Sequence, residues 1–195
     1  MVVNGPSSSG KTTWLLRFLA HAGEMISPAP KQVLYAYGEY HEHVPALEKA
    51  GVLTHAGLPT DTVLADCKKP MLLVLDDLML ASSEEYLADL FTKKSHHQHI
   101  SVVFLTQNLF SKQLKVARNN AQYLVLMNAP NAALSVQTLG SQLFPGQVRY
   151  FLDAYRKATE KRYGYLLLDM HASGCPTLRL RTDIFPDEHT VIFIP

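Results

Sequence analysis

Residues 5–12 read GPSSSGKT, which fits the pattern G-x-x-x-x-G-K-[ST] in full. The residues before this motif are mostly apolar and are expected to form a strand. An amphipathic stretch, expected as a helix over Thr12–Ala22, follows the motif and stops at Gly23. A strand, a glycine-rich turn and a helix in this order form a loop that holds phosphate groups. This motif restricts the possible folds more than any other feature of the sequence, because it requires a strand before the turn and a helix after it.

The residue types of the motif suit the binding of a polyphosphate. Glycines let the backbone turn tightly and bring its N–H groups to phosphate oxygens, and the helix adds the positive end of its dipole. We expect Lys11 to place its charge on the β- and γ-phosphates and the Thr12 hydroxyl to ligate Mg²⁺. The alternative, a turn with an unrelated lysine, is disfavoured by the flanking strand and helix. The expected nucleotide-binding residues are Gly5, Ser7, Ser8, Ser9, Gly10, Lys11, Thr12 and Thr13.

Composition limits the class of protein. Of the 195 residues, 47% are apolar and 18% are charged, which is typical of a globular domain and excludes collagen, low-complexity disorder and coiled coils. The net charge of +1 argues neither for nor against nucleic acid as a partner. Two cysteines cannot form a disulfide framework, which favours a reducing compartment. The longest apolar runs, of about five residues, are far shorter than the ~18–20 that a membrane span needs, so no membrane association is expected.

Short apolar runs alternate with helical segments along the chain. Most of these runs are continuous, as in strands that are buried on both faces of a parallel sheet. The pattern predicts an α/β fold, namely a three-layer sandwich with a mostly parallel central sheet, as one domain over residues 1–195. The short segment before the phosphate loop leaves open whether the product is truncated at its N-terminus or begins naturally there. Ser82 and Glu85 form a capping box that predicts the start of one helix. The expected strands are Val33–Tyr37, Met71–Leu75, Val102–Leu105, Tyr123–Met127, Tyr165–Leu168 and Val191–Ile194.

Two carboxylates follow the apolar run Met71–Leu75. Hydrolysis of a bound nucleotide needs a metal ion held from a second side and a water positioned for attack. We expect Asp76 to belong to the Mg²⁺ shell and Asp77 to polarise the water. Many nucleotide hydrolases have glutamate as this base, and aspartate is shorter by about 1.5 Å. A pair that only caps the following turn is the alternative.

A third polar strand end follows Val102–Leu105, where Thr106, Gln107 and Asn108 come in succession. A glutamine at this place can hydrogen-bond to the γ-phosphate or to the attacking water. In small nucleotide kinases the strand with the metal carboxylate lies next to the phosphate-loop strand, whereas in motor NTPases a strand with a polar sensor lies between them. Gln107 favours the second order, with the sensor strand between the phosphate-loop strand and the acidic strand. A plain polar turn is the alternative.

In chain order the sequence reads GPSSSGKT, YAYGEY, MLLVLDDLM, HHQHISVVFLTQNLF, YLVLMNAP, LFPGQVRYFLDAYRKAT, YGYLLLD and LRLRTDIFP. This series resembles the genome-packaging ATPases of large DNA viruses and of virus-like elements integrated in animal genomes (Polinton/Maverick and adintovirus types). These are poxvirus-type members of the FtsK/HerA class. The resemblance extends from Val2 to the last expected strand. It departs at Asn131, where relatives often have a basic residue after the proline.

The resemblance implies ATP as the nucleotide, with Lys11, Asp76, Asp77 and Gln107 as catalytic residues. It also implies that Arg118 is an arginine finger that reaches the nucleotide of a neighbouring subunit in a homo-oligomeric ring; a cation at a helix C-terminus is the alternative. The implied partners are double-stranded DNA and capsid or portal-like proteins. The implied location is the interior of a host cell, in the nucleus or the cytoplasm, or the virion.

Several alternatives stay open at this point. Lys112, Lys115 and Arg118 recur at a spacing of three and are expected to share a helix face toward DNA or a neighbouring subunit, with Ser111 as a helix cap. A small P-loop nucleotide kinase is the second hypothesis for the function, and a nucleotide-binding relic without turnover is the third. The histidine-rich stretch HHQH lacks accompanying cysteines or carboxylates at ligand spacing, which disfavours a zinc site.

Overall fold

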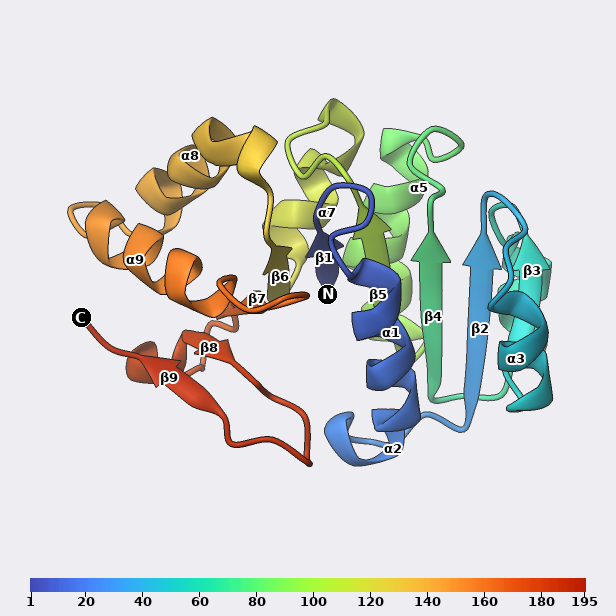
Figure 1. The fold of residues 1–195 in the computed structure, drawn as a ribbon. Coiled ribbons are helices and arrows are strands. Elements are labelled where there is room, and N and C mark those ends of the chain that lie inside the picture. Colours follow the sequence, from blue (N-terminus) through green and yellow to red (C-terminus); the bar gives the residue numbers. More distant parts are fainter. The chain divides into compact units, whose positions relative to one another are not determined.

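A computed structural model describes residues 1–195, apart from the side chain of His96. The chain folds into two compact units that are interleaved in the sequence. The first comprises Met1–Val2 and Ala22–Ala121, and the second comprises Val3–His21 and Gln122–Pro195. Figure 1 shows the elements of both units.

The first unit is a parallel sheet with short helices. Its strands are ordered β3-β2-β4-β5, and each adjacent pair is parallel. Figure 1 shows α3 and α5 on opposite faces of this sheet. The strands are β2 (Gln32–Tyr37), β3 (Leu53–Ala56), β4 (Met71–Asp76) and β5 (Ile100–Thr106). The helices are α2 (Ala22–Met25), α3 (Val44–Lys49), α4 (Asp61–Asp66), α5 (Glu84–Asp89), α6 (Ser95–His97) and α7 (Lys115–Asn120), with a π-helical turn over Leu90–Lys94 and a 3₁₀ turn over Lys112–Leu114.

The first residue of the chain pairs with β5. The Met1 amino group donates to the Val102 carbonyl at 2.7 Å, and the Met1 carbonyl accepts from the Phe104 N–H at 3.1 Å. When one residue bonds to the two residues that flank its partner, the pairing is parallel. β5 therefore lies between β4 and the first residue of the chain, which agrees with the order expected for a sensor strand.

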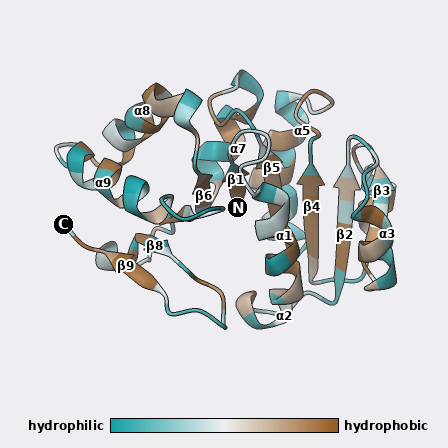
Figure 2. Cartoon of the chain, viewed as in Figure 1, coloured by the Kyte–Doolittle hydropathy of each residue, from teal (hydrophilic) through white to brown (hydrophobic). Residues whose placement is uncertain are grey.

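The core of the first unit explains why its strands are apolar without alternation. Residues Met71–Leu75 of β4 are all buried, as are Leu34–Ala36 of β2, and Figure 2 shows β2 and β4 as hydrophobic strands. A strand covered on both faces has no solvent side and needs no polar residue until it ends. The polar residues of this unit are thereby displaced to the strand ends.

Helix α5 begins one residue later than the capping box predicted. The Ser83 hydroxyl accepts from the Tyr86 N–H at 3.1 Å and is the cap. The Ser82 hydroxyl is buried and donates to the Leu78 carbonyl at 2.6 Å. The prediction of Ser82 as the cap was wrong because this buried bond to the preceding turn takes its hydroxyl.

The second unit combines an antiparallel sheet with three longer helices. Its strands are ordered β6-β7-β8-β9, and each adjacent pair is antiparallel. The fold is therefore mixed α/β, with parallel pairing among β2–β5 and antiparallel pairing among β6–β9. The strands are β6 (Tyr123–Met127), β7 (Tyr165–Asp169), β8 (Leu180–Thr182) and β9 (Val191–Phe193), and β1 (Val2–Asn4) enters this unit from the first. The helices are α1 (Lys11–Ala20), α8 (Ala133–Leu143) and α9 (Val148–Ala158), with 3₁₀ turns over Pro130–Ala132 and Pro176–Leu178.

An aromatic cluster anchors α1 in the second unit. The Trp14 ring stacks on Phe18 with centroids 5.1 Å apart, and it also contacts Tyr165 and Phe185 at 5.9 and 5.8 Å. Trp14 and Phe18 are buried. Aromatic pairs of this kind add stabilisation beyond their buried area. The helix that follows the phosphate loop is thus fixed by residues more than a hundred positions away in the sequence.

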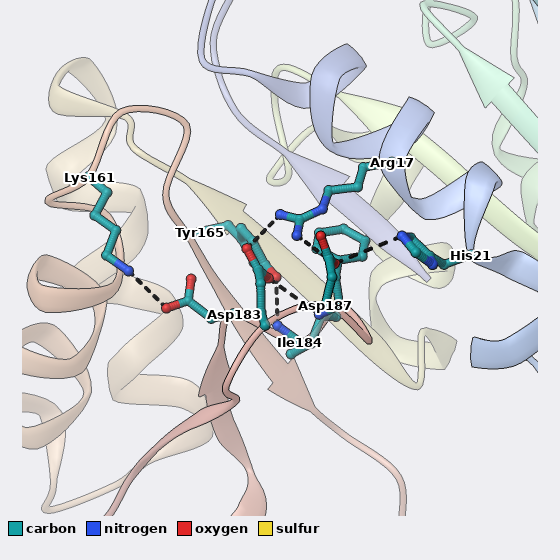
Figure 3. A network of polar contacts seen from close by, with 9 residues as sticks. Arg17, His21, Lys161, Tyr165, Asp183, Ile184 and Asp187 are labelled. Carbon is teal, nitrogen blue, oxygen red and sulfur yellow. Dashed lines mark hydrogen bonds and ion pairs between the residues drawn. The ribbon is translucent and has the colours of Figure 1, made fainter.

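A polar network ties the same helix to the segment after β8. Arg17 pairs with Asp187 at 2.7 Å and with Glu188 at 2.5 Å, and its guanidinium lies 4.3 Å from the Phe185 ring centroid. Figure 3 shows Arg17, in α1, and His21, directly after this helix, pointing at Asp187. Arg17 therefore connects α1 to the C-terminal part of this unit. Among the described residues, no helix is both long and apolar enough to cross a membrane.

Candidate nucleotide-binding site

The phosphate-loop motif occupies the turn between β1 and α1, in the second unit. Helix α1 begins at Lys11, one residue earlier than predicted, and Gly10 precedes it with a φ of +100°. Ser8 also has a left-handed backbone, with a φ of +62°. A left-handed residue directly before a helix is favourable for glycine, which has no Cβ to collide with its own carbonyl. The local geometry is the tight turn that the motif predicts.

Two glycines of the loop are required by close approach to other segments of the second unit. A Cβ on Gly5 would lie 2.6 Å from the Met127 Cβ at the end of β6. A Cβ on Gly10 would lie 2.6 Å from Cδ1 of the Tyr163 ring, which comes from the segment before β7. The loop is therefore packed against two other strand connections.

The Lys11 side chain folds back over the loop. Its ammonium group donates to the carbonyls of Gly5 and Pro6, at 2.7 and 2.8 Å. Ser7, Ser8 and Thr13 are exposed, and Thr12 is half-buried. The charge of Lys11 is thus held among the backbone carbonyls of the same loop.

The two carboxylates lie at the carboxyl end of β4, in the first unit. Asp76 is the last residue of the strand and is half-buried. Asp77 is exposed and has a left-handed backbone, with a φ of +54°. Such a conformation is uncommon outside glycine, although aspartate adopts it more readily than most residues. The chain therefore turns sharply after Asp76.

A buried tyrosine holds Asp76 in place. The Tyr35 hydroxyl, at the middle of β2, donates to Asp76 Oδ2 at 2.5 Å. Burial, and then the negative charge of Asp76, raise the pKa of Tyr35 far above its ordinary value, so the hydroxyl keeps its proton. His41 Nε2 lies 2.7 Å from the same hydroxyl, and His41 Nδ1 accepts from the His43 N–H at 3.3 Å. The bond to Nδ1 assigns the ring proton to Nε2, which donates to Tyr35.

The turn after β2 also packs directly on the acidic turn. The Gly38 N–H donates to the Asp76 carbonyl at 3.0 Å, and a Cβ on Gly38 would collide with the Asp77 carbonyl oxygen. The sequence predicted no role for the segment YAYGEY beyond its part in the family resemblance. The signal that could have found it was a tyrosine-rich strand end at the same edge as the two aspartates.

Gln107 is the first residue beyond β5 and is exposed. The turn that it opens is held by its neighbours, because Thr106 Oγ1 accepts from the Asn108 N–H and Asn108 Oδ1 accepts from the Phe110 N–H, each at 3.1 Å. β4 and β5 are parallel, with Leu75 opposite Phe104. The structure therefore brings Asp76, Asp77 and Gln107 to one edge of the first unit, as the strand pattern predicted.

Arg118 lies in α7 and contacts the loop after β5. Its Nη1 donates to the Leu109 carbonyl at 3.0 Å, and its guanidinium lies 4.6 Å from the Phe110 ring centroid. Lys112 and Lys115 are exposed, and Lys112 belongs to a 3₁₀ turn that runs directly into α7, so the three cations do not lie on one regular α-helix. The predicted cap by the Ser111 side chain is not made. Arg118 thus supports the loop that begins at Gln107.

The residues available for a divalent cation are oxygen donors. Among the described residues, no group of three or more histidines, cysteines, aspartates and glutamates is gathered into a metal cage. Mg²⁺ in nucleotide sites is commonly held by one or two protein oxygens together with phosphates and water. The Thr12 hydroxyl and the Asp76 carboxylate are donors of this chemical type.

Comparisons with known proteins give a distant structural likeness only. No family model matches the chain, and no curated protein matches it. One solved structure that it resembles is described as Thermomonospora curvata EccC (ATPases 2 and 3) in complex with a signal sequence peptide, with a TM-score of 0.42 and 14% identity. The similarity covers 99% of this chain and 36% of the EccC chain, so this chain spans about a third of that protein's length.

Proposed function

We propose that the chain is a P-loop ATPase in which the phosphate loop and the edge that carries Asp76, Asp77 and Gln107, here called the acidic edge, act on one nucleotide. The observation that carries this proposal is the pairing of Met1 with β5. The motif begins four residues after Met1, and four residues span at most about 14 Å. Met1 runs parallel to β5, and β5 ends at the edge that carries Asp76, Asp77 and Gln107, which supports the proposal.

Each side chain then has a chemical task. Lys11 binds the β- and γ-phosphates, and its loop supplies backbone N–H donors. Asp77 accepts a proton from the attacking water, and Gln107 orients that water against the γ-phosphate. Thr12 and Asp76 would hold Mg²⁺, which supplies charge neutralisation on the phosphates when it is bound.

Within this class, we propose a DNA-translocating motor that works as a homo-oligomeric ring and packages a viral genome. The position of β5 between β4 and the first residue of the chain supports a motor over a nucleotide kinase. The series of motifs along the whole chain supports the packaging ATPases. Exposed Lys112 and Lys115 are candidate phosphate contacts for double-stranded DNA. Capsid or portal-like partners and a location inside the host cell or in the virion belong to the same proposal.

One assay separates the functional classes. Phosphate release from ATP is measured with and without double-stranded DNA, alongside phosphoryl transfer to nucleoside monophosphates. We expect release that DNA stimulates and no transfer. Transfer to monophosphates identifies a small P-loop nucleotide kinase and overturns the motor. Nucleotide binding without release or transfer identifies a relic that has lost turnover.

A second assay tests Arg118 as a finger that acts in trans. Arg118→Ala and Asp77→Asn subunits are each expected to be inactive alone. Mixing them is expected to restore part of the activity, because a ring then contains interfaces with an intact arginine facing an intact Asp77. If Arg118 only supports its own loop through Leu109 and Phe110, no mixing ratio restores activity.

A further inference from the structure

Strand β2 and the turn after it lie outside every motif of the phosphate-binding class and yet contact the acidic edge at three points. Tyr35 bonds to the Asp76 side chain, and Gly38 bonds to the Asp76 backbone and packs on Asp77. Tyr35 is fully buried and belongs to the central part of β2. A hydroxyl in such a place normally has a partner that satisfies it, and its partner here is a carboxylate with a proposed function.

The geometry fixes both ends of this contact. His41 donates to the Tyr35 oxygen at 2.7 Å, so the hydroxyl hydrogen is left to point at Asp76 Oδ2, 2.5 Å away. The Tyr35 ring also stacks on Tyr37 with centroids 6.2 Å apart, which limits its rotation. A carboxylate held at one oxygen by a fixed donor has a defined plane, and its second oxygen has a defined direction.

We propose that Tyr35, held by His41, is a positioning residue that orients the Asp76 carboxylate toward the cation of a bound metal–nucleotide complex. The proposal rests on the proposed function, in which Asp76 is an Mg²⁺ ligand. Residues that hydrogen-bond to a metal ligand orient it, and their loss typically lowers metal affinity or activity by about 10–100-fold. The alternative is that Tyr35 only fills the core of the first unit.

The decisive variant is Tyr35→Phe, which removes the hydroxyl and keeps the ring. Binding of Mn²⁺ is measured by electron paramagnetic resonance in the presence of a non-hydrolysable ATP analogue, and binding of the analogue alone is measured without metal. We expect Mn²⁺ affinity to fall by about 10-fold or more, with little change in the affinity for the metal-free analogue. The matched control is Tyr37→Phe, which removes a hydroxyl from the neighbouring ring and is expected to leave both affinities unchanged.

His41 provides the same test outside the core, because its side chain is half-buried. His41→Ala removes the donor that orients Tyr35 and is expected to lower Mn²⁺ affinity in the same direction. His41→Gln keeps an N–H donor and is expected to recover part of the loss. A purely structural role for Tyr35 predicts altered thermal stability without this dependence on the donor.

The outcomes distinguish failure of the positioning role of Tyr35 from failure of the proposed function. Wild-type affinity for Mn²⁺ in Tyr35→Phe and in His41→Ala overturns the positioning role and leaves the proposed ATPase intact. A wild-type protein that binds no Mn²⁺–nucleotide complex overturns the proposed function together with this inference. Equal losses in Tyr35→Phe and Tyr37→Phe also overturn it, because the effect would then not depend on the bond to Asp76.

Discussion

The phosphate loop and the acidic edge are built in opposite ways. The loop is a motif of eight consecutive residues with local side-chain hydrogen bonds, since Lys11 bonds to carbonyls five and six residues earlier. The acidic edge depends on distant segments, because Asp76 is held by Tyr35, which is 41 residues away in the sequence. A site made of consecutive residues can therefore be recognised as a sequence motif. A site built from distant segments shows only polar residues at strand ends until the pairing of the strands is known.

The largest effect on nucleotide affinity is expected from a substitution in the phosphate loop. Lys11→Ala removes the positive charge at the phosphates, and charge-assisted bonds contribute up to about 3 kcal/mol each. We expect nucleotide affinity to fall by about 100-fold or more and turnover to be lost, as measured by titration with a fluorescent ATP analogue. Lys157→Ala, on the exposed face of α9, is the matched control. Wild-type affinity in Lys11→Ala would remove the loop from the site.

The next largest effect is expected at the acidic edge, where a substitution lowers the rate of hydrolysis and leaves nucleotide binding unchanged. Asp77→Asn keeps the size of the side chain and removes its basicity. General-base catalysis contributes about 10²–10⁴-fold, so we expect kcat to fall by that factor while nucleotide affinity stays unchanged. Asp66→Asn, an exposed acid in α4 of the same unit, is expected to behave as wild type. Normal turnover in Asp77→Asn would exclude it as the base.

The same contrast explains how much of the molecule the sequence predicted. Continuous apolar runs correctly indicated β2, β4, β5, β6 and β7, because burial on both faces demands them. The run Val191–Ile194 also indicated β9, although Val191 and Ile192 are exposed. β3 was missed because Leu53–Ala56 contains Thr54 and His55 and is not buried at any position. Its strand conformation comes from pairing with β2 at the edge of the sheet rather than from its own pattern.

The residues of the candidate site also differ in how well the sequence predicted them. The phosphate loop, the two aspartates and Gln107 were predicted because each is a short motif or a polar strand end. Tyr35 and His41 were not, since a buried tyrosine inside an apolar run reads as core. The register of β2 against β4, which places Tyr37 opposite Asp76, shows that this strand also reaches the acidic edge.

A smaller effect, on the free energy of unfolding, is expected from substituting glycines with left-handed backbones. It distinguishes the cost of the backbone conformation from the cost of close packing. Gly10 and Gly146 both have left-handed backbones in the second unit, with φ of +100° and +78°, but only Gly10 has a neighbour within 4 Å of the Cβ position. A left-handed residue with a Cβ costs about 1–2 kcal/mol, and overpacking adds roughly 1–3 kcal/mol. We expect Gly10→Ala to lower the free energy of unfolding in urea by more than Gly146→Ala. Equal losses would show that Tyr163 gives way without cost.

The smallest effect, on the melting temperature, is expected from the contact between Arg17 and Asp187. This contact holds α1, which follows the phosphate loop, to a distant segment of the chain. The hydrogen bond from Arg17 holds the pKa of Asp187 below its ordinary value of 3.8. A depressed acid pKa stabilises the folded protein above the unfolded value, and this stabilisation is lost as the pH falls through the folded one. Arg17→Met is therefore expected to lower the melting temperature at pH 7 by no more than about 2–4 °C. The difference from wild type should shrink as the pH falls through the depressed pKa of Asp187.

The control for this anchor is Arg156→Met, which removes an exposed arginine paired with Asp153 within α9 at 3.1 Å. A pair between neighbouring turns of one helix adds little to the free energy of folding, so its melting temperature should stay close to that of wild type at both pH values. A difference between Arg17→Met and wild type that is as large at pH 2.5 as at pH 7 would mean that the Phe185 ring, and not the carboxylates, anchors Arg17. In that case the phosphate-loop helix is held by packing alone, and the contrast between the local loop and the hydrogen-bonded acidic edge becomes sharper.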